Sequence, residues 1–135
     1  MILQPSILCP IDFSESSESA LKWAAELSSR LNYHLTIVYP YRLLQVANGE
    51  AIFLKKQNEE NASKKFAALE KNYLRGKNIS YDFSPEVGFV NDRVDYHLKK
   101  EAIVLMVISK NMNLKNSEST EEFINHTNVP VLVVP

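Results

Sequence analysis

Asp12 is the residue of this 135-residue chain whose position best suits chemistry. It follows the short apolar run Ile7–Cys9 and comes two residues before Ser14, a favoured helix N-cap residue. An acid therefore lies where a first strand is expected to turn into a first helix. In open α/β sheets, ligands bind outside the carboxyl ends of the strands. A structural role is the alternative, because aspartate often orients the turn in which it lies. Both roles stay open.

Other reactive side chains give weaker signals. Cys9 falls in a predicted central strand with no histidine at a recognisable activating spacing, so a small buried hydrophobe is the favoured interpretation. His34, His97 and His126 share no metal-ligand spacing with acids, and His126 suits a helix C-terminus. No Ser-His-Asp arrangement, nucleophile elbow or paired-carboxylate motif stands out. We therefore expect no enzymatic activity and no metal site.

Composition and charge are those of an ordinary globular protein. Fifteen Lys and Arg against sixteen Asp and Glu give a net charge of -1, so no basic field points to nucleic acid. The longest apolar run, 102–108, is far too short to span a bilayer, and the first five residues show no export signal. A single cysteine excludes an intrachain disulfide and fits a reducing compartment. We expect one cytoplasmic domain over residues 1–135, with neither nucleic acid nor membrane as partner.

Apolar runs alternate with amphipathic segments along the chain. The patterns predict strands at 7–10, 34–39, 79–87, 103–108 and 129–134. They predict helices at 14–31, 50–74, 91–100 and 119–126. Strands that alternate with helices indicate an α/β fold with a mostly parallel sheet and helices on both faces.

Several local features sharpen these expectations. Ser119 with Glu122 forms a capping-box pattern, and Asn91 or Asp92 is expected to cap the 91–100 helix. Weak periodicity at 57–61 leaves a break in the second helix open. Apolar residues at helical spacing from Ala20 to Leu31 form one inward stripe.

Two strands carry their own burial predictions. The continuous apolar run 103–108 is typical of a parallel strand that is buried on both faces. Loose alternation and a proline in 79–87 suit an edge strand. Pro40 is expected to end the second strand, with a loop over 41–49.

The sequence resembles the universal stress protein family over essentially its whole length. The most specific pieces are Ile7-Leu-Cys-Pro-Ile-Asp-Phe-Ser14 and the ending from His126 to Val134, because their order and spacing match together. The resemblance implies a five-stranded parallel sheet in the order 3-2-1-4-5, a Rossmann-like open sandwich. It also implies a homodimer formed through the last strand, Val129–Val134. A partner there would cover an apolar sheet edge that is otherwise an aggregation liability.

The family's phosphate-binding pattern is incomplete in this chain. Many members bind ATP through a loop of the form Gly-x2-Gly-x9-Gly-(Ser/Thr), where backbone N–H groups at a helix N-terminus surround the phosphates. This chain has only Gly49, Gly76 and Gly88, so no glycine follows residue 88. The matching segment, 109–117, is too short for the motif. Three acids at the following helix N-terminus would repel phosphate: Glu118, Glu121 and Glu122.

Some residues of this segment oppose that conclusion. Asn111, Asn113 and Asn116 tolerate left-handed backbone, and Lys110 and Lys115 could meet phosphate as point charges. The resemblance therefore implies, at most, a remnant nucleotide pocket. Its expected residues are Pro10, Ile11, Asp12, Tyr39, Ser109 and Lys110.

These observations favour a non-catalytic, homodimeric stress-response protein that acts through protein contacts, without tight ATP binding and with no cofactor. The alternative is a nucleotide-binding stress protein that holds ATP with a degenerate phosphate loop. A third hypothesis, an enzyme of a related nucleotide-binding α/β family, would need a deep pocket at Asp12, Tyr39 and Ser109. The remnant pocket also suits a ligand that is smaller and less charged than ATP.

Overall fold

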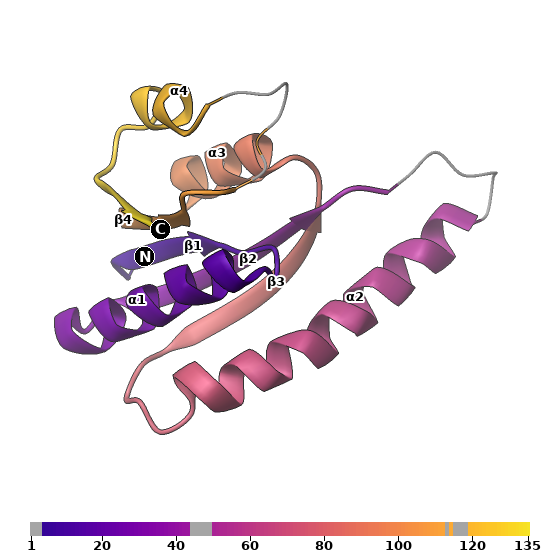
Figure 1. Ribbon diagram of the computed structural model, residues 1–135, viewed down its shortest axis with the longest axis horizontal. Helices are drawn as coiled ribbons and strands as arrows, with labels where there is room; N and C mark the ends of the chain where they lie inside the picture. Colours follow the sequence, from indigo (N-terminus) through magenta and orange to yellow (C-terminus); the bar gives the residue numbers. More distant parts are fainter. Residues whose placement is uncertain (1–3, 44–49, 113, 115–118) are drawn as a thin grey trace.

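A five-stranded parallel sheet in the order β3-β2-β1-β4-β5 forms the centre of the structure. The structure is a computed structural model and describes residues 4–43, 50–112, 114 and 119–135 (Figure 1). Its strands are β1 (Ser6–Pro10), β2 (His34–Tyr41), β3 (Tyr81–Val87), β4 (Ile103–Ser109) and β5 (Val131–Val134). Its helices are α1 (Glu15–Leu31), α2 (Glu50–Leu69), the π-helical η1 (Glu70–Leu74), α3 (Val90–Lys100) and α4 (Thr120–Asn125). The predicted fold class and strand order are confirmed.

Helices cover both faces of the sheet, as the alternating patterns predict. Helices α1 and α2 lie on one face and α3 and α4 on the other (Figure 1). Alternate residues of β1 enter the two apolar layers, with Ile7 and Cys9 facing α1 and Leu8 facing α3. No helix of the described residues is long and apolar enough to cross a membrane.

Short polar side chains begin and end the helices where the sequence places them. Ser14 caps α1 by accepting a hydrogen bond from the backbone N–H of Ser17 at 3.2 Å. Asn32, with φ of 57°, ends that helix in the left-handed conformation. Ser119 accepts from the N–H of Glu122 at 3.1 Å, as the capping-box pattern predicts.

The second helix differs from its expectation. The break considered at 57–61 does not occur, because α2 continues through this segment to Leu69. The irregularity lies further on, in η1, where the N–H of Arg75 donates to the carbonyl of Glu70 at 2.8 Å. The expected loop over 41–49 falls partly outside the described residues, which omit 44–49.

Tertiary contacts move four element boundaries. Helix α3 begins at Val90 with Phe89 as its N-cap, so the predicted cap at Asn91 or Asp92 is wrong. Strand β2 continues through Pro40 to Tyr41, beyond the predicted end. Its pairing with β1 ends at Val38, so the N–H that proline lacks would have had no partner in β1. Strands β3 and β5 each begin two residues later than predicted.

Two burial predictions also fail at element ends. Leu31 is 48% exposed, because it is the last residue of α1 and extends beyond the covering layer. Val104 is 38% exposed, because β5 pairs with β4 only from Met106 onward. The edge position of β3 is confirmed.

Candidate functional site

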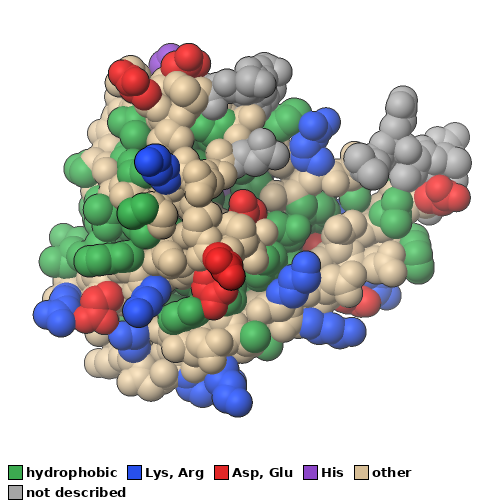
Figure 2. Space-filling view, in the orientation of Figure 1, with side chains coloured by type: hydrophobic (Ala, Val, Ile, Leu, Met, Phe, Trp, Pro, Cys, Tyr) green, Lys and Arg blue, Asp and Glu red, His purple; other side chains and the backbone are tan. Residues whose placement is uncertain are grey.

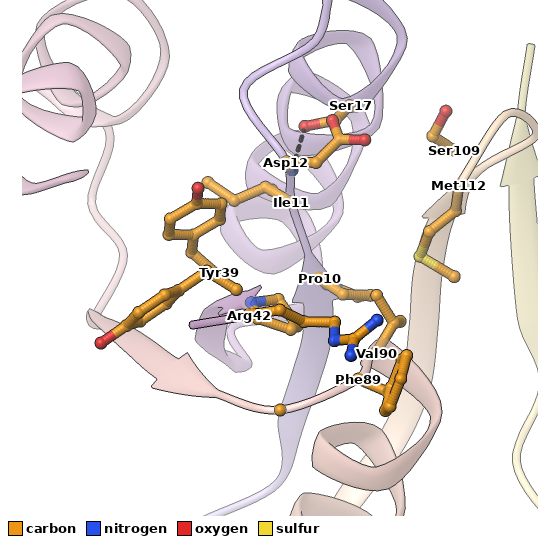
Figure 3. Close-up of a pocket in the computed structure, with 13 residues that line it drawn as sticks. Pro10, Ile11, Asp12, Ser17, Tyr39, Arg42, Phe89, Val90, Ser109 and Met112 are labelled. Atoms are coloured by element: carbon orange, nitrogen blue, oxygen red, sulfur yellow. Dashed lines mark hydrogen bonds between the residues drawn. The ribbon is translucent and has the colours of Figure 1, made fainter. Parts of the chain in front are cut away.

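A cavity of about 260 Å³ opens at the carboxyl ends of β1, β2 and β4 (Figure 3). The sheet order reverses between β1 and β4, and this switch point is where open α/β sheets bind ligands. The volume is near the lower limit of small-molecule sites, which is about 300 Å³. The lining residues come from the ends of four strands, the loops after them and the first turns of α1 and α3: Pro10, Ile11, Asp12, Ser17, Tyr39, Pro40, Tyr41, Arg42, Gly88, Phe89, Val90, Ser109 and Met112.

Five of the six residues predicted for the site line this cavity, namely Pro10, Ile11, Asp12, Tyr39 and Ser109. Lys110 does not. Its backbone N–H donates to the carbonyl of Val134 at 2.8 Å, and the residue is exposed. The structure thus brings most of the predicted set together, while the set's role in binding stays a prediction. Residues 113 and 115–118, with the expected Glu118 and Lys115, lie outside the described part of the chain.

Asp12 orients the turn between β1 and α1 and also faces the cavity. Its Oδ1 accepts from the backbone N–H of Ser14 at 3.0 Å and from the Ser14 hydroxyl. Its own N–H donates to Ser17 Oγ at 3.0 Å (Figure 3). Oδ2 has no hydrogen bond to a described residue. The carboxylate can therefore hold the turn and still accept a hydrogen bond from a ligand.

Aromatic side chains form a wall of the cavity beside Asp12. The rings of Tyr39 and Phe13 meet edge to face with centroids 4.8 Å apart, and Tyr39 stacks on Tyr41 at 5.7 Å. Burial, and to a lesser extent the charge of Asp12, raise the pKa of Tyr39. The phenol is therefore a hydrogen-bond donor at neutral pH. Phe13 has φ of 64°, which is unusual for a bulky residue.

The opposite wall forms where β2 and β3 end side by side. The N–H of Gly88 donates to the carbonyl of Tyr41 at 2.8 Å. Gly88 has φ of 143°, and a Cβ atom there would lie 3.0 Å from Cδ of Arg93. The turn brings Phe89 under the guanidinium of Arg42, whose Cζ lies 4.0 Å from the ring centroid. Sequence patterns did not identify Arg42, Phe89 or Met112 as site residues, since each lies in a segment without periodicity.

A second polar cluster lies at the amino ends of β2 and β3, away from the cavity. Nδ1 of His34 is 2.9 Å from Ser80 Oγ, and Nε2 is 2.7 Å from Asp82 Oδ2. The sequence showed no Ser-His-Asp arrangement because adjacent parallel strands bring residues 46 and 48 positions apart together. None of the three lines the cavity at the switch point. Within the described residues, no group of three or more His, Cys, Asp or Glu could hold a metal ion.

Residues 5–135 match the profile of the universal stress protein family. The chain belongs to this family. A comparison of the sequence with curated proteins found no match. Among solved structures, UspA from Lactobacillus plantarum is similar at 19% identity, with both chains fully covered and a TM-score of 0.74. A universal stress protein family member from Burkholderia pseudomallei has 20% identity, a TM-score of 0.73, and coverage of 96% of this chain and 95% of that one.

A third universal stress protein was solved with a nucleotide. The protein from Archaeoglobus fulgidus, in complex with dAMP, is 17% identical to this chain, with full coverage of both and a TM-score of 0.68. At these identities the likeness concerns the fold. This universal stress protein therefore shares its α/β architecture with these relatives, as the sequence patterns predicted.

Proposed function

We propose that this universal stress protein is a non-catalytic, homodimeric stress-response domain whose cavity takes a nucleoside or nucleoside monophosphate and does not hold ATP tightly. The observation that carries the proposal is the uneven chemistry of the cavity at the switch point. Its side chains suit a base and a sugar, whereas few groups suit a polyphosphate.

The nucleoside part of the proposal rests on the walls of the cavity. Aromatic and apolar surfaces with a few placed polar groups are the usual lining of a small-molecule site. Here, Tyr39 and Ile11 provide apolar surface. Asp12 Oδ2 and the hydroxyl of Ser109 lie where sugar hydroxyls could bond. The dAMP complex of the Archaeoglobus fulgidus relative supports this ligand class.

The weak binding of ATP follows from charge and backbone. A triphosphate needs several cations or a nest of N–H groups with close backbone approach. No glycine follows Gly88 in the chain. Among the described residues that line the cavity, Arg42 alone carries a positive charge, and Asp12 opposes it. Glu121 and Glu122 stand in the first turn of α4, where they already complement the helix dipole.

Isothermal titration with adenosine, AMP and ATP with Mg²⁺ tests this proposal. We expect AMP and adenosine to bind in the range of tens to hundreds of micromolar, on the order of -5 to -6 kcal/mol, and ATP to bind no more tightly than AMP. Asp12→Ala should abolish the binding, and Asp95→Ala, which changes an exposed acid on α3, should not. A low-micromolar dissociation constant for ATP would contradict the proposal and favour the alternative with a degenerate phosphate loop.

The homodimer is proposed through the free edge of β5. This strand has one neighbour in the sheet, β4, so one side of its backbone faces outward. Its side chains are apolar, and an apolar unprotected edge favours pairing with a second strand. If β5 paired with the β5 strand of a second copy about a twofold axis, neither β5 edge would remain open. Sedimentation equilibrium at micromolar concentration checks this, and a monomer alone would overturn it.

A further inference from the structure

Arg42 is a cation at the cavity wall whose guanidinium makes a ring contact with Phe89. Its guanidinium lies on the face of the Phe89 ring, with Cζ 4.0 Å from the centroid. Such stacking uses the flat face of the group and leaves the five N–H donors in its plane. Within the described residues, Arg42 makes neither a hydrogen bond nor an ion pair. The residue is exposed, and the ring contact orients the guanidinium while leaving its donors accessible to a ligand.

We propose that Arg42 binds the anionic group of the cavity's ligand, a phosphate monoester. The ligand then lies with its phosphate toward the corner formed by β2 and β3, and away from Ser109 and Lys110 at the end of β4. This inference rests on the proposed function, because it assigns the orientation and charge of the ligand that the cavity takes.

The charges around the cavity support this orientation. Figure 3 shows Asp12 and Ser17 at one end of the site and Arg42 beside Phe89 at the other. A phosphate near Asp12 would face a carboxylate, whereas a sugar hydroxyl there could donate to Oδ2. Asp12 thus favours the sugar of the ligand, and Arg42 favours its phosphate.

The groups near β4 offer less to a phosphate. Lys110, unlike Arg42, does not line the cavity, so its charge lies farther from the ligand. At the Arg42 end, Val90 opens helix α3, and the partial positive charge of a helix N-terminus favours an anion. Asp92 in the first turn of α3 offsets part of that effect. The guanidinium, which can bind two phosphate oxygens at once, is the main anchor.

The difference in affinity between AMP and adenosine measures the contribution of the phosphate. In the native protein we expect AMP to bind at least tenfold more tightly. Arg42→Gln should remove this difference and leave adenosine within twofold. Arg42→Lys should retain only part of it, since a lysine cannot make the bidentate contact. Lys110→Gln is the matched control on the β4 side and should leave the difference unchanged.

Three outcomes would overturn the inference. The first is loss of the AMP preference in Lys110→Gln but not in Arg42→Gln, which would place the phosphate on the β4 side. The second is equal weakening of both ligands by Arg42→Gln, which would show a packing role. The third is an Arg42 Nε–H resonance that does not shift when inorganic phosphate is added.

If neither AMP nor adenosine binds, the proposed function fails, and a titration with inorganic phosphate then tests Arg42 alone. The Arg42 Nε–H resonance should shift during a phosphate titration, and a resonance that stays fixed would reject the anion site.

Discussion

The imidazole of His97 lies with Nε2 2.8 Å from Oε2 of Glu86, a contact that joins α3 to β3 below the surface of the protein. Its other ring nitrogen, Nδ1, meets the carboxylate of Glu101. Each ring nitrogen of His97 thus faces a carboxylate, which is a hydrogen-bond acceptor when ionised. Arg93 adds an ion pair to the same carboxylate, with Nε 2.7 Å from Oε1 of Glu86. The network thus ties α3 to β3 at two points, Arg93 near the start of the helix and His97 near its end.

Replacement of His97 should destabilise the protein strongly. The residue is 7% exposed, and His97→Ala would remove a partner from both Glu86 and Glu101. We expect a loss of about 3 kcal/mol in the free energy of unfolding, because two partly buried carboxylates each lose a hydrogen-bond partner. Urea unfolding measures it, and Lys99→Ala, an exposed change on the same helix, should stay within about 0.5 kcal/mol. A loss below 1 kcal/mol for His97→Ala would contradict the expected role.

Stability should also fall in acid through Glu86. Burial raises the pKa of this carboxyl, but hydrogen bonds from Arg93 and His97 outweigh it, so the net pKa lies below its usual 4.5. The unfolded chain then takes up protons at a higher pH than the folded chain. The stabilisation is therefore complete above about pH 4.5 and is lost as the pH falls through the folded pKa. Urea titrations from pH 6 to pH 3 should show a shallower acid loss in Glu86→Gln than in the native protein.

Much of the fold follows from signals that are local in the sequence. Ser14 and Ser119 mark helix starts because capping involves neighbouring residues. The run 103–108 is recognisable as a strand from its β-branched composition. The prediction of the α3 start at Asn91 or Asp92 failed because the corner at Gly88, tied to Tyr41, determines where the chain can turn.

The site was predictable only where it coincides with strand ends. Asp12, Tyr39 and Ser109 each lie at the end of a predicted strand or just after it, and parallel strands bring their carboxyl ends to one edge. Arg42 and Phe89 were missed because their contact depends on β2 and β3 lying side by side, at positions 47 residues apart. His97 was missed for the same reason, since Glu86 belongs to another element.

Phe13 offers a test of strain at the candidate site. With φ of 64°, the residue adopts the left-handed conformation, which costs an L-residue about 1–2 kcal/mol relative to glycine. Phe13→Ala removes the ring contacts with Tyr39 and Phe83 but keeps this cost, and Phe13→Gly removes both. We expect the glycine variant to be more stable than the alanine variant by about 1 kcal/mol. Thermal unfolding of the two decides this, and a more stable alanine variant would exclude strain at this position.

Cys9 should be unreactive in the folded protein. Its side chain is fully buried in β1, and burial raises the pKa of the thiol to about 12. The thiolate, which is the nucleophile, is therefore scarce at neutral pH. We expect a disulfide reagent such as DTNB to label one thiol per chain in urea and almost none in buffer, at a rate limited by unfolding. Rapid labelling in buffer would show that β1 opens, and Cys9→Ala would confirm which residue reacts.

The backbone of β5 allows a sharp test of the proposed dimer. The carbonyls of Pro130 and Val134 accept from β4, so the alternate residues Val131 and Val133 direct their N–H groups to the open edge. Val133→Pro should remove one outward donor without breaking a bond to β4, and it should give a folded monomer. Val133→Ala shortens the same side chain but keeps the N–H, so it should remain dimeric.

Leu132 gives the contrasting result in the same experiment. Its N–H faces β4, so Leu132→Pro breaks the internal ladder and should cost about 3 kcal/mol or more. Sedimentation equilibrium with circular dichroism distinguishes the three variants. If Val133→Pro remains dimeric while folded, the two chains do not pair through β5, and the contact must lie on another surface.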